Sequence, residues 1–196
     1  MGQAVERRVS VDEYLALEES SQERHAFWDG QVWAMSGGTF AHDALSTAMA
    51  AELRAALAGS GCSASGPNLR VKSLETGLYT YADALVVCGP HFEDPKRTTL
   101  LNPRVIVEVL SDATEAYDRG EKFAHYRSIE SLGDYVLVST SAPLVEVYSR
   151  APSAWELRVF RQSDTVHLPA ADVALSVDAL YRGIELDPPR ALGTPR

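Results

Sequence analysis

Apolar and branched residues gather in the middle of the chain in short runs that predict β-strands. Turn or loop segments such as GPHFEDPKR separate these runs. Near the end of this region two runs follow each other closely, as in a β-meander. The predicted strands are LRVKSL, LYTYADALVVC, RVIVEVL, DYVLVST, PLVEVYSR and WELRVF.

Apolar residues at helical spacing predict helices on both sides of the first strand runs. Ser10 and Glu13 form a capping-box pattern at the start of a short helix over residues 10–19. Small and apolar residues recur at helical spacing in a longer segment before Gly59. The pattern therefore predicts further helices over residues 40–57, 111–128 and 173–186.

A two-residue turn signal, Asp29-Gly30, divides HAFWDGQVWAM into two short strands and predicts a β-hairpin. The order of elements is then helix, hairpin, helix, several strands, helix and several strands. This order predicts an α/β or α+β fold with one mixed sheet covered by helices. A single domain is expected over residues 10–186, with tails at 1–9 and 187–196, the second of them disordered.

Composition narrows the class of protein. The 196 residues are 45% hydrophobic and 23% charged, as in an ordinary globular protein. The chain has no apolar run of transmembrane length and no apolar signal-peptide centre, so a cytoplasmic protein without a membrane partner is expected. Cys62 and Cys88 stand far apart without a CxxC motif. They indicate neither a disulfide framework nor a zinc site and are expected to be small core residues.

The formal net charge of −9 lowers the expectation of a wide basic surface for nucleic acid. It does not exclude a local basic groove, and it is compatible with a carboxylate site that binds a cation.

An acidic residue interrupts the most apolar of the predicted strands. In RVIVEVL, Glu108 shares a face with Ile106 and Leu110, and in TYADALVVC, Asp83 shares a face with Leu85. Consecutive strands are often neighbours in a sheet, so the two carboxylates could converge. Two close anions repel each other unless a cation separates them, and Mg²⁺ typically takes one or two carboxylates. Alternatively, Asp83 begins a turn and Glu108 lies on a solvated edge.

The helix expected after Glu108 carries a polar stripe. Asp118, Lys122 and Tyr126 follow one another at four-residue steps and share one face. The simpler interpretation is a surface ion pair between Asp118 and Lys122. The functional interpretation places the ammonium of Lys122 over the two carboxylates, where it could orient the attacking water, lower its pKa or bind a phosphate oxygen.

Several segments together are similar to a known family. Asp83, VIVEVLS, YDRGEKFAHYR and DYVLVS carry the resemblance, supported by YLALEES, by RHAFWDGQVWAMSGG with His42 after it, and by VEVYSR. They resemble the Uma-two-like putative restriction endonuclease domain family of the PD-(D/E)xK nuclease superfamily, from Val11 to about Leu186. The resemblance implies a restriction-endonuclease-like central mixed sheet flanked by helices. It also implies phosphodiester hydrolysis with one or two metal ions, and often a homodimer.

The family motif can be placed on this chain residue by residue. Asp83 and Glu108 take the positions of its two acids, and the backbone carbonyl of Val109 is a plausible further metal ligand. The motif's lysine position is Leu110 here, and Lys122 on the following helix is the matching lysine. Two positions depart from the family pattern, because Ala82 replaces a usual Pro and Ala26 replaces a usual Glu.

The leading hypothesis is a nuclease that uses Mg²⁺ or Mn²⁺ to hydrolyse DNA, with Asp83, Glu108 and Lys122 as catalytic residues. Tyr126 and Asp118 would contact and orient these groups. His42 could face the site, although packing or helix capping is the simpler interpretation. The alternative is a nuclease fold that binds nucleic acid or protein without hydrolysis, which Ala26 and the acidic net charge favour. A hydrolase that uses His with Ser or Cys is only weakly indicated, because the chain has no GxSxG motif and its histidines show no recognisable pairing.

Basic residues near these motifs are candidate contacts for the DNA backbone. Scattered Lys and Arg side chains are more often simply solvated, so this assignment is the weakest. The candidates are Arg70, Lys72 and Arg119, followed by Lys96, Arg97 and Arg127.

Overall fold

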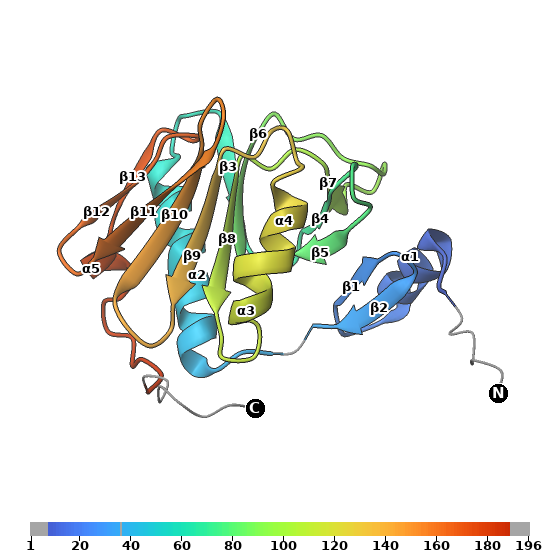
Figure 1. Cartoon of the computed structure of the whole chain (residues 1–196), viewed down its shortest axis with the longest axis horizontal. Coiled ribbons are helices and arrows are strands. Elements are labelled where there is room, and N and C mark those ends of the chain that lie inside the picture. The colour runs from blue at the N-terminus through green and yellow to red at the C-terminus, as the bar shows by residue number, and fades with distance from the viewer. Residues whose placement is uncertain (1–7, 36, 189–196) are drawn as a thin grey trace.

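The largest element of the fold is a mixed six-stranded sheet in the order β11-β10-β9-β8-β6-β3 (Figure 1). The structure is a computed structural model that describes residues 8–35 and 37–188. β8 and β9 pair in parallel, and the other neighbours in this sheet pair antiparallel. The strands are β3 (Cys62–Ser65), β6 (Ala84–Cys88), β8 (Val105–Leu110), β9 (Asp134–Ser139), β10 (Leu144–Arg150) and β11 (Trp155–Arg161).

A second sheet of five strands, in the order β2-β1-β5-β4-β7, lies toward the N-terminal end of the molecule. Figure 1 shows its hairpin and the first helix far from the C-terminal strands. The strands are β1 (His25–Trp28), β2 (Gln31–Ala34), β4 (Arg70–Lys72), β5 (Tyr79–Tyr81) and β7 (Thr99–Leu100). β12 (Thr165–Leu168) and β13 (Val173–Ser176) form a separate pair.

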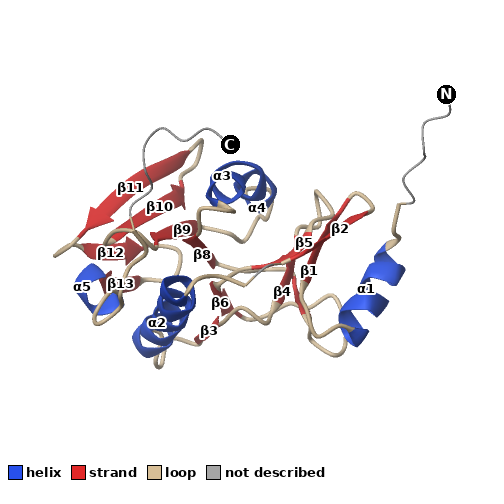
Figure 2. Ribbon diagram, turned by 90° about the horizontal axis from the view of Figure 1, so that it is seen from below, coloured by secondary structure: helices blue, strands red, loops and turns tan. Residues whose placement is uncertain are grey.

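Helices cover both faces of the six-stranded sheet, as Figure 2 shows. α2 (Phe40–Ala56) packs Leu45, Met49 and Leu53 on the valine face of β8. On the opposite face, the segment of α3, a π-helix and α4 packs against Ile106 and Leu110. The bounds are α1 (Val11–Ser20), α3 (Glu115–Tyr117), the π-helix η1 (Asp118–Lys122), α4 (Phe123–Tyr126) and α5 (Val177–Leu180).

The N-terminal elements confirm the local sequence signals. The Ser10 hydroxyl accepts a hydrogen bond from the Glu13 N–H at 3.2 Å, and the Glu13 carboxylate accepts one from the Ser10 N–H at 2.8 Å. This reciprocal pair is the predicted capping box of α1. At the hairpin, Asp29 and Gly30 have φ of 46° and 79°, the left-handed conformation that a two-residue hairpin turn requires.

The predicted mixed α/β architecture with helices on both faces of a mixed sheet is confirmed, but the described strands form three sheets and not one, and two boundaries are wrong. The run 78–88 is not one strand: β5 ends at Tyr81 in the five-stranded sheet, and β6 begins at Ala84 in the six-stranded sheet. The segment 173–186 is helical only over α5, because its first four residues pair with β12. In both segments, long-range strand pairing overrides the local pattern.

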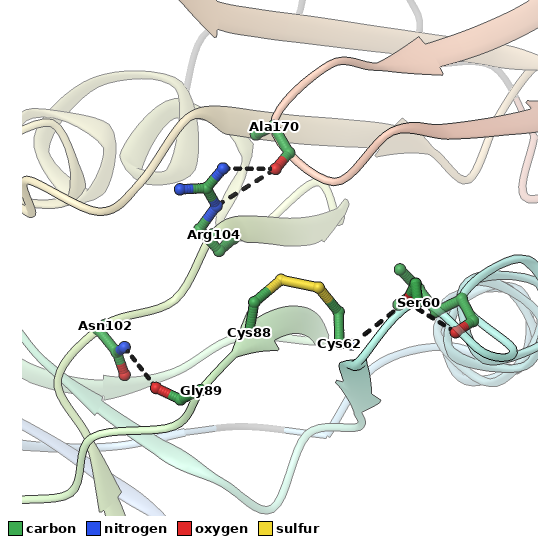
Figure 3. The surroundings of a disulfide bond; sticks show 8 residues. Ser60, Cys62, Cys88, Gly89, Asn102, Arg104 and Ala170 are labelled. Carbon is green, nitrogen blue, oxygen red and sulfur yellow. Dashed lines mark hydrogen bonds between the residues drawn. A yellow bond between two sulfur atoms is a disulfide. The ribbon is translucent and has the colours of Figure 1, made fainter.

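The two cysteines form a disulfide, so the expectation of two free core thiols is wrong (Figure 3). β3 pairs antiparallel with β6 and places Cys62 directly opposite Cys88, with 4.2 Å between their Cα atoms. The short polar strand β3 gives little apolar signal in the sequence, so the pairing could not be anticipated. Disulfides persist mainly in oxidising compartments, and the cytoplasmic location remains a prediction.

The predicted tails are only partly described. The Val9 N–H donates to the Gly30 carbonyl at 2.8 Å, which ties this residue to the hairpin. Asp187 accepts a hydrogen bond from the Thr39 hydroxyl at 2.8 Å, so it is held against the start of α2. Residues 1–7 and 189–196 lie outside the described ranges, and the domain limits remain predictions. None of the described helices has the length and apolar character to cross a membrane.

Candidate active site

A pocket of about 720 Å³ lies between the N-terminal hairpin and the six-stranded sheet. One wall comes from the hairpin, with Ala26 and Trp33 among its residues. The opposite wall and the floor come from β8 and the helical segment after it. Asp83, at the junction of the two sheets, also lines the pocket. The site is therefore built from elements far apart in the sequence.

Glu108 lies at the floor of this pocket and is only 3% exposed. As the strand alternation predicts, it shares the face of Ile106 and Leu110. The ammonium nitrogen of Lys122 lies 2.8 Å from one carboxylate oxygen. The Tyr126 hydroxyl donates to the other at 2.9 Å. A cation and a hydrogen bond thus compensate the buried carboxylate, so the alternative of a solvated edge is excluded.

Lys122 and Asp118 belong to η1 and are buried, with exposed fractions of 4% and 3%. The Lys122 ammonium lies 3.5 Å from an Asp118 carboxylate oxygen. The surface ion pair considered from the sequence is therefore excluded. The predicted continuous helix widens here into a π-helix that includes Gly120, the residue with the poorest helix propensity in the segment. π-helical turns of this kind often occur at functional sites.

Asp83 is held by the edge of β8 and by α2. Its N–H donates to the Val107 carbonyl at 3.1 Å, and its carboxylate accepts from the Val109 N–H at 2.7 Å. The pairing of Ala84 with Val107, continued by one residue, places Asp83 opposite Glu108. The two acids thus meet at the pocket, although Asp83 lies between two strands and not within one.

His42, near the start of α2, also lines the pocket. Its Nε2 lies 3.4 Å from a carboxylate oxygen of Asp83. Thr39 provides the side-chain cap of the helix, so His42 faces the site and does not cap. Gly38 permits this position, because a Cβ there would come within 2.5 Å of the imidazole ring. Gly38 therefore has a steric role beside the site, whereas a Cβ on Gly37 would meet nothing within 4 Å.

The buried charges shift one another's ionisation. Burial raises the pKa of Glu108 to about 8, and the charge of Lys122 opposes this rise. Burial disfavours the Lys122 ammonium, yet Glu108, Asp118 and Asp83 raise its pKa above the usual value. Burial would likewise raise the pKa of Asp83, but His42, Lys122 and the Val109 N–H hold it below the usual value. The hydrogen bond with Asp83 raises the pKa of His42.

The oxygen ligands in the pocket meet the minimum that Mg²⁺ or Mn²⁺ requires. Asp83 and Glu108 provide two carboxylates, and the backbone of Val109 reaches the same surface. Both Glu108 oxygens already accept hydrogen bonds or contact Lys122, but each retains a second lone pair. Within residues 8–35 and 37–188, no group of three His, Cys, Asp or Glu side chains could hold a metal ion. Asp83, Glu108 and Val109 therefore fit a metal ion whose remaining coordination positions are filled by waters or substrate oxygens.

Ala26 lines the same pocket from the hairpin side. It occupies the position at which the resembled family usually has Glu. A carboxylate at this position would face the pocket together with Asp83 and Glu108. The methyl group of Ala26 contributes no carboxylate to this wall.

The hairpin register creates an aromatic wall that the sequence interpretation missed. Ala26 pairs with Trp33 across the hairpin, and Trp28 follows two residues later on the same face. All three residues line the pocket, and Tyr117 joins them from the end of α3. The hairpin signal at Asp29-Gly30 fixes this register, so the wall could have been derived from the sequence.

The predicted DNA contacts lie outside the described pocket lining. Arg70 is buried and donates to Thr99. Lys72 pairs with Glu93, and Arg119 pairs with Glu115 and Glu146. Their contact with DNA remains a prediction, and this geometry lends it no support. Arg24, which was not predicted, is exposed and does line the pocket.

Comparisons with known proteins agree with this architecture. A family model described as "Putative restriction endonuclease", named Uma2, matches residues 11–179. An uncharacterized protein of Synechocystis sp., slr1290, is 35% identical over 179 residues, which cover 90% of this chain and 93% of that protein. A second uncharacterized Synechocystis protein, sll1609, is 28% identical over 148 residues, or 75% of this chain and 84% of that protein.

A solved structure shares the fold. It is described as a "putative nuclease belonging to DUF820" from Anabaena variabilis. The TM-score is 0.71 at 17% identity, over 88% of this chain and 97% of that chain.

Proposed function

The chain belongs to the Uma2 family, and from this premise we propose that it is a metal-dependent nuclease that hydrolyses phosphodiester bonds of DNA. The observation that supports the proposal most directly is the contact of Lys122 with Glu108 at 2.8 Å on the floor of a pocket that Asp83 also lines. Buried acids beside a lysine are costly for stability and are found preferentially where chemistry requires them.

Asp83, Glu108 and the Val109 carbonyl would hold Mg²⁺ or Mn²⁺, which would polarise a phosphate oxygen and provide a water of lowered pKa. The donor set leaves room for the substrate phosphate to complete the coordination shell.

A homodimer, which the family resemblance implied, remains a prediction that light scattering can test.

Lys122 acts in this proposal as a fixed positive charge. Its raised pKa keeps the ammonium protonated at neutral pH, and the neighbouring Asp118 restricts its position. The ammonium can then donate a hydrogen bond to a phosphate oxygen as negative charge develops there. Tyr126 holds the Glu108 carboxylate from the other side, and His42 holds that of Asp83. These contacts prearrange the reacting groups before substrate binds.

Cleavage of DNA by the purified chain tests the proposal. We expect cleavage of a mixture of single-stranded and duplex DNA with Mg²⁺ or Mn²⁺, and its loss with a chelator. Asp83→Ala should abolish the activity, and Lys122→Ala should reduce it severely. Arg8→Ala is the control, because Arg8 is also ion-paired, with Asp29, but lies outside the pocket lining and is not a predicted DNA contact. Activity that survives both pocket substitutions would reject the site.

A second function, a nuclease fold that binds its partner without hydrolysis, is favoured by Ala26. Asp83 and Glu108 are the two carboxylates proposed for the metal, and in the described ranges no third acid, His or Cys completes a metal-binding group with them. Calorimetry with Mn²⁺ separates the two functions. Heat of binding that disappears in Asp83→Asn supports the nuclease. A well-folded sample that takes up no Mn²⁺ supports the binding function.

A further inference from the structure

We propose that the pocket accepts an unpaired nucleotide, so that the DNA substrate is single-stranded at the site of cleavage. This inference rests on the proposed nuclease function and specifies its substrate class. Three features of the pocket support it: the depth of the reacting groups, the aromatic wall of the hairpin, and the scarcity of free cations around the opening.

The reacting groups lie too deep for the backbone of an intact duplex. Glu108 and Lys122 are 3% and 4% exposed, at the floor of a pocket of about 720 Å³. This volume is in the range of sites for single small ligands. Duplex DNA is stiff over about 150 base pairs, so a sharp local bend into such a pocket is costly. The backbone of an unpaired strand is flexible at each nucleotide. One nucleotide can therefore enter the pocket and bring its phosphate close to Glu108 and Lys122.

The hairpin wall offers the surfaces that unpaired bases bind. Trp28 and Trp33 stand on the same face of the hairpin, where Ala26 lies directly opposite Trp33 and two residues before Trp28. Trp28 is anchored, because its indole N–H donates to the Thr76 carbonyl at 3.1 Å and its ring contacts His125. Trp33 is 42% exposed, so part of its ring is accessible to a ligand at the pocket. Aromatic faces of this kind stack nucleobases in proteins that bind single strands.

Tyr117 extends the aromatic surface on the opposite side of the pocket. It directly precedes η1, the segment that carries Asp118 and Lys122. A base between the hairpin and Tyr117 would therefore place its attached phosphate toward the charged floor. The aromatic side chains can therefore contact the base of a nucleotide, and the charged floor can contact its phosphate.

The distribution of positive charge also disfavours a duplex. Duplex binding depends on a wide basic footprint, whereas this chain has a net charge of −9. In the described lining of the pocket, Arg24, His42 and Lys122 are the basic side chains. His42 contacts Asp83, and Lys122 contacts Glu108, so Arg24 is left for a flanking phosphate. Its guanidinium lies 5.9 Å from the centre of the Tyr81 ring at the pocket. Stacking must therefore supply most of the affinity.

Fluorescence titration tests the binding step. Two of the three tryptophans of the chain line the pocket, so their emission reports on its occupancy. The probes are an oligothymidine strand and the same strand paired with oligoadenosine, in Ca²⁺ to prevent cleavage. We expect the single strand to quench the emission and to bind at least about tenfold more tightly than the duplex. Equal affinity for both probes would overturn the inference.

Substitutions in the aromatic wall link this binding to the proposed residues. Trp33→Ala should raise the Kd for the single strand about tenfold, and Trp33→Phe should restore it to within about twofold. Tyr117→Ala is a second variant on the other side of the pocket, with the same expected direction. Leu157→Ala is the control, because Leu157 is also exposed and apolar but lies outside the pocket lining. If Trp33→Ala alters only self-association and leaves the Kd unchanged, the exposed indole is an interface and the inference is wrong.

Cleavage assays separate this inference from the proposed function. The substrates are a fully paired duplex with closed ends and the same duplex with an internal unpaired bubble. Cleavage confined to the bubble supports the inference. Cleavage of the closed duplex at an equal rate overturns it, while the nuclease function stands. Tight single-strand binding that Trp33→Ala weakens, without cleavage of any substrate, supports the inference and rejects the hydrolytic function.

Discussion

The two walls of the pocket differ in nearly every physical property. The wall from β8 and η1 carries Glu108, Asp118 and Lys122, each less than 5% exposed and each in contact with another charge. The hairpin wall has no such charged cluster among its pocket-lining residues, and its Trp33 is half exposed. The wall from β8 and η1 holds charged groups in fixed positions, and the hairpin wall presents a flat apolar surface.

The difference indicates that the two walls have separate roles, one in the chemical step and the other in substrate selection. Charges buried at the floor of the pocket can act on the reacting phosphate because they are shielded from water and held by fixed partners. The aromatic wall cannot take part in that chemistry, but it can select what reaches the floor. In this account, changes in the charged wall alter turnover and metal binding, whereas changes in the aromatic wall alter affinity for the substrate.

The largest expected effect comes from the removal of the buried ammonium. Lys122→Met should lower the rate of cleavage by about a thousandfold or more, with a small change in KM. It should also destabilise the fold by about 3 kcal/mol, since Glu108 loses the cation that compensates it. Steady-state kinetics and urea unfolding measure the two effects. A variant that keeps full turnover would contradict the division between the walls, and Arg8→Met, outside the pocket lining, provides the baseline.

Removal of the disulfide should affect the six-stranded sheet and leave the hairpin wall intact. The bond joins β3 to β6 and closes a loop across a sequence separation of 26 residues. The double substitution Cys62→Ala/Cys88→Ala should lower the free energy of unfolding by about 3 kcal/mol. Urea unfolding with and without a reductant measures this difference in the wild type. The tryptophan emission of the folded variant should match that of the wild type, and a large shift would mean that the two regions are coupled.

Metal uptake should depend on pH through the charged wall. Burial raises the pKa of Glu108 to about 8, so protons compete with a cation for this carboxylate around neutral pH. The affinity for Mn²⁺ should therefore rise with pH, by about tenfold per unit between pH 6 and 8, and level off above this range. Calorimetry across this range measures the slope. Glu108→Gln should bind weakly without this slope, and a slope that persists in the variant would assign the proton to another group.

The smallest expected effect comes from the addition of a carboxylate to the hairpin wall. Ala26→Glu would place this carboxylate in the pocket that Asp83 and Glu108 line, and it should lower the Kd for Mn²⁺ about tenfold. Ala26→Gln is the matched control, of the same length without the charge. Equal gains in both variants would show that size, and not charge, determines the effect. No gain with Glu would mean that the hairpin wall does not reach the metal.

The local sequence pattern was sufficient for the elements that build the charged wall. The alternation in RVIVEVL placed Glu108 on the face of Ile106, and the four-residue steps placed Lys122 and Tyr126 on one face. Both side chains contact Glu108 in the structure. The spacing could not show whether Asp118 and Lys122 pair in water or in the interior, because both cases use the same four-residue step.

Other features depend on contacts between distant segments and escaped the sequence pattern. The alternation continues through Ala82 and Asp83, so nothing local marks the change of sheet there. β3 is too short and too polar to be predicted as a strand from the sequence. The disulfide between Cys62 and Cys88 depends on the pairing of this strand and was therefore not predicted either. The catalytic roles of the pocket residues remain predictions, since geometry shows proximity and not reaction.

Anomalous diffraction from a crystal soaked in Mn²⁺ shows whether Asp83 and Glu108 hold a metal ion together. We expect a peak between them, at about 2.0–2.3 Å from a carboxylate oxygen of each residue. A well-ordered crystal with no peak in the pocket, or with a peak bound elsewhere and the Glu108–Lys122 contact unchanged, would contradict this expectation.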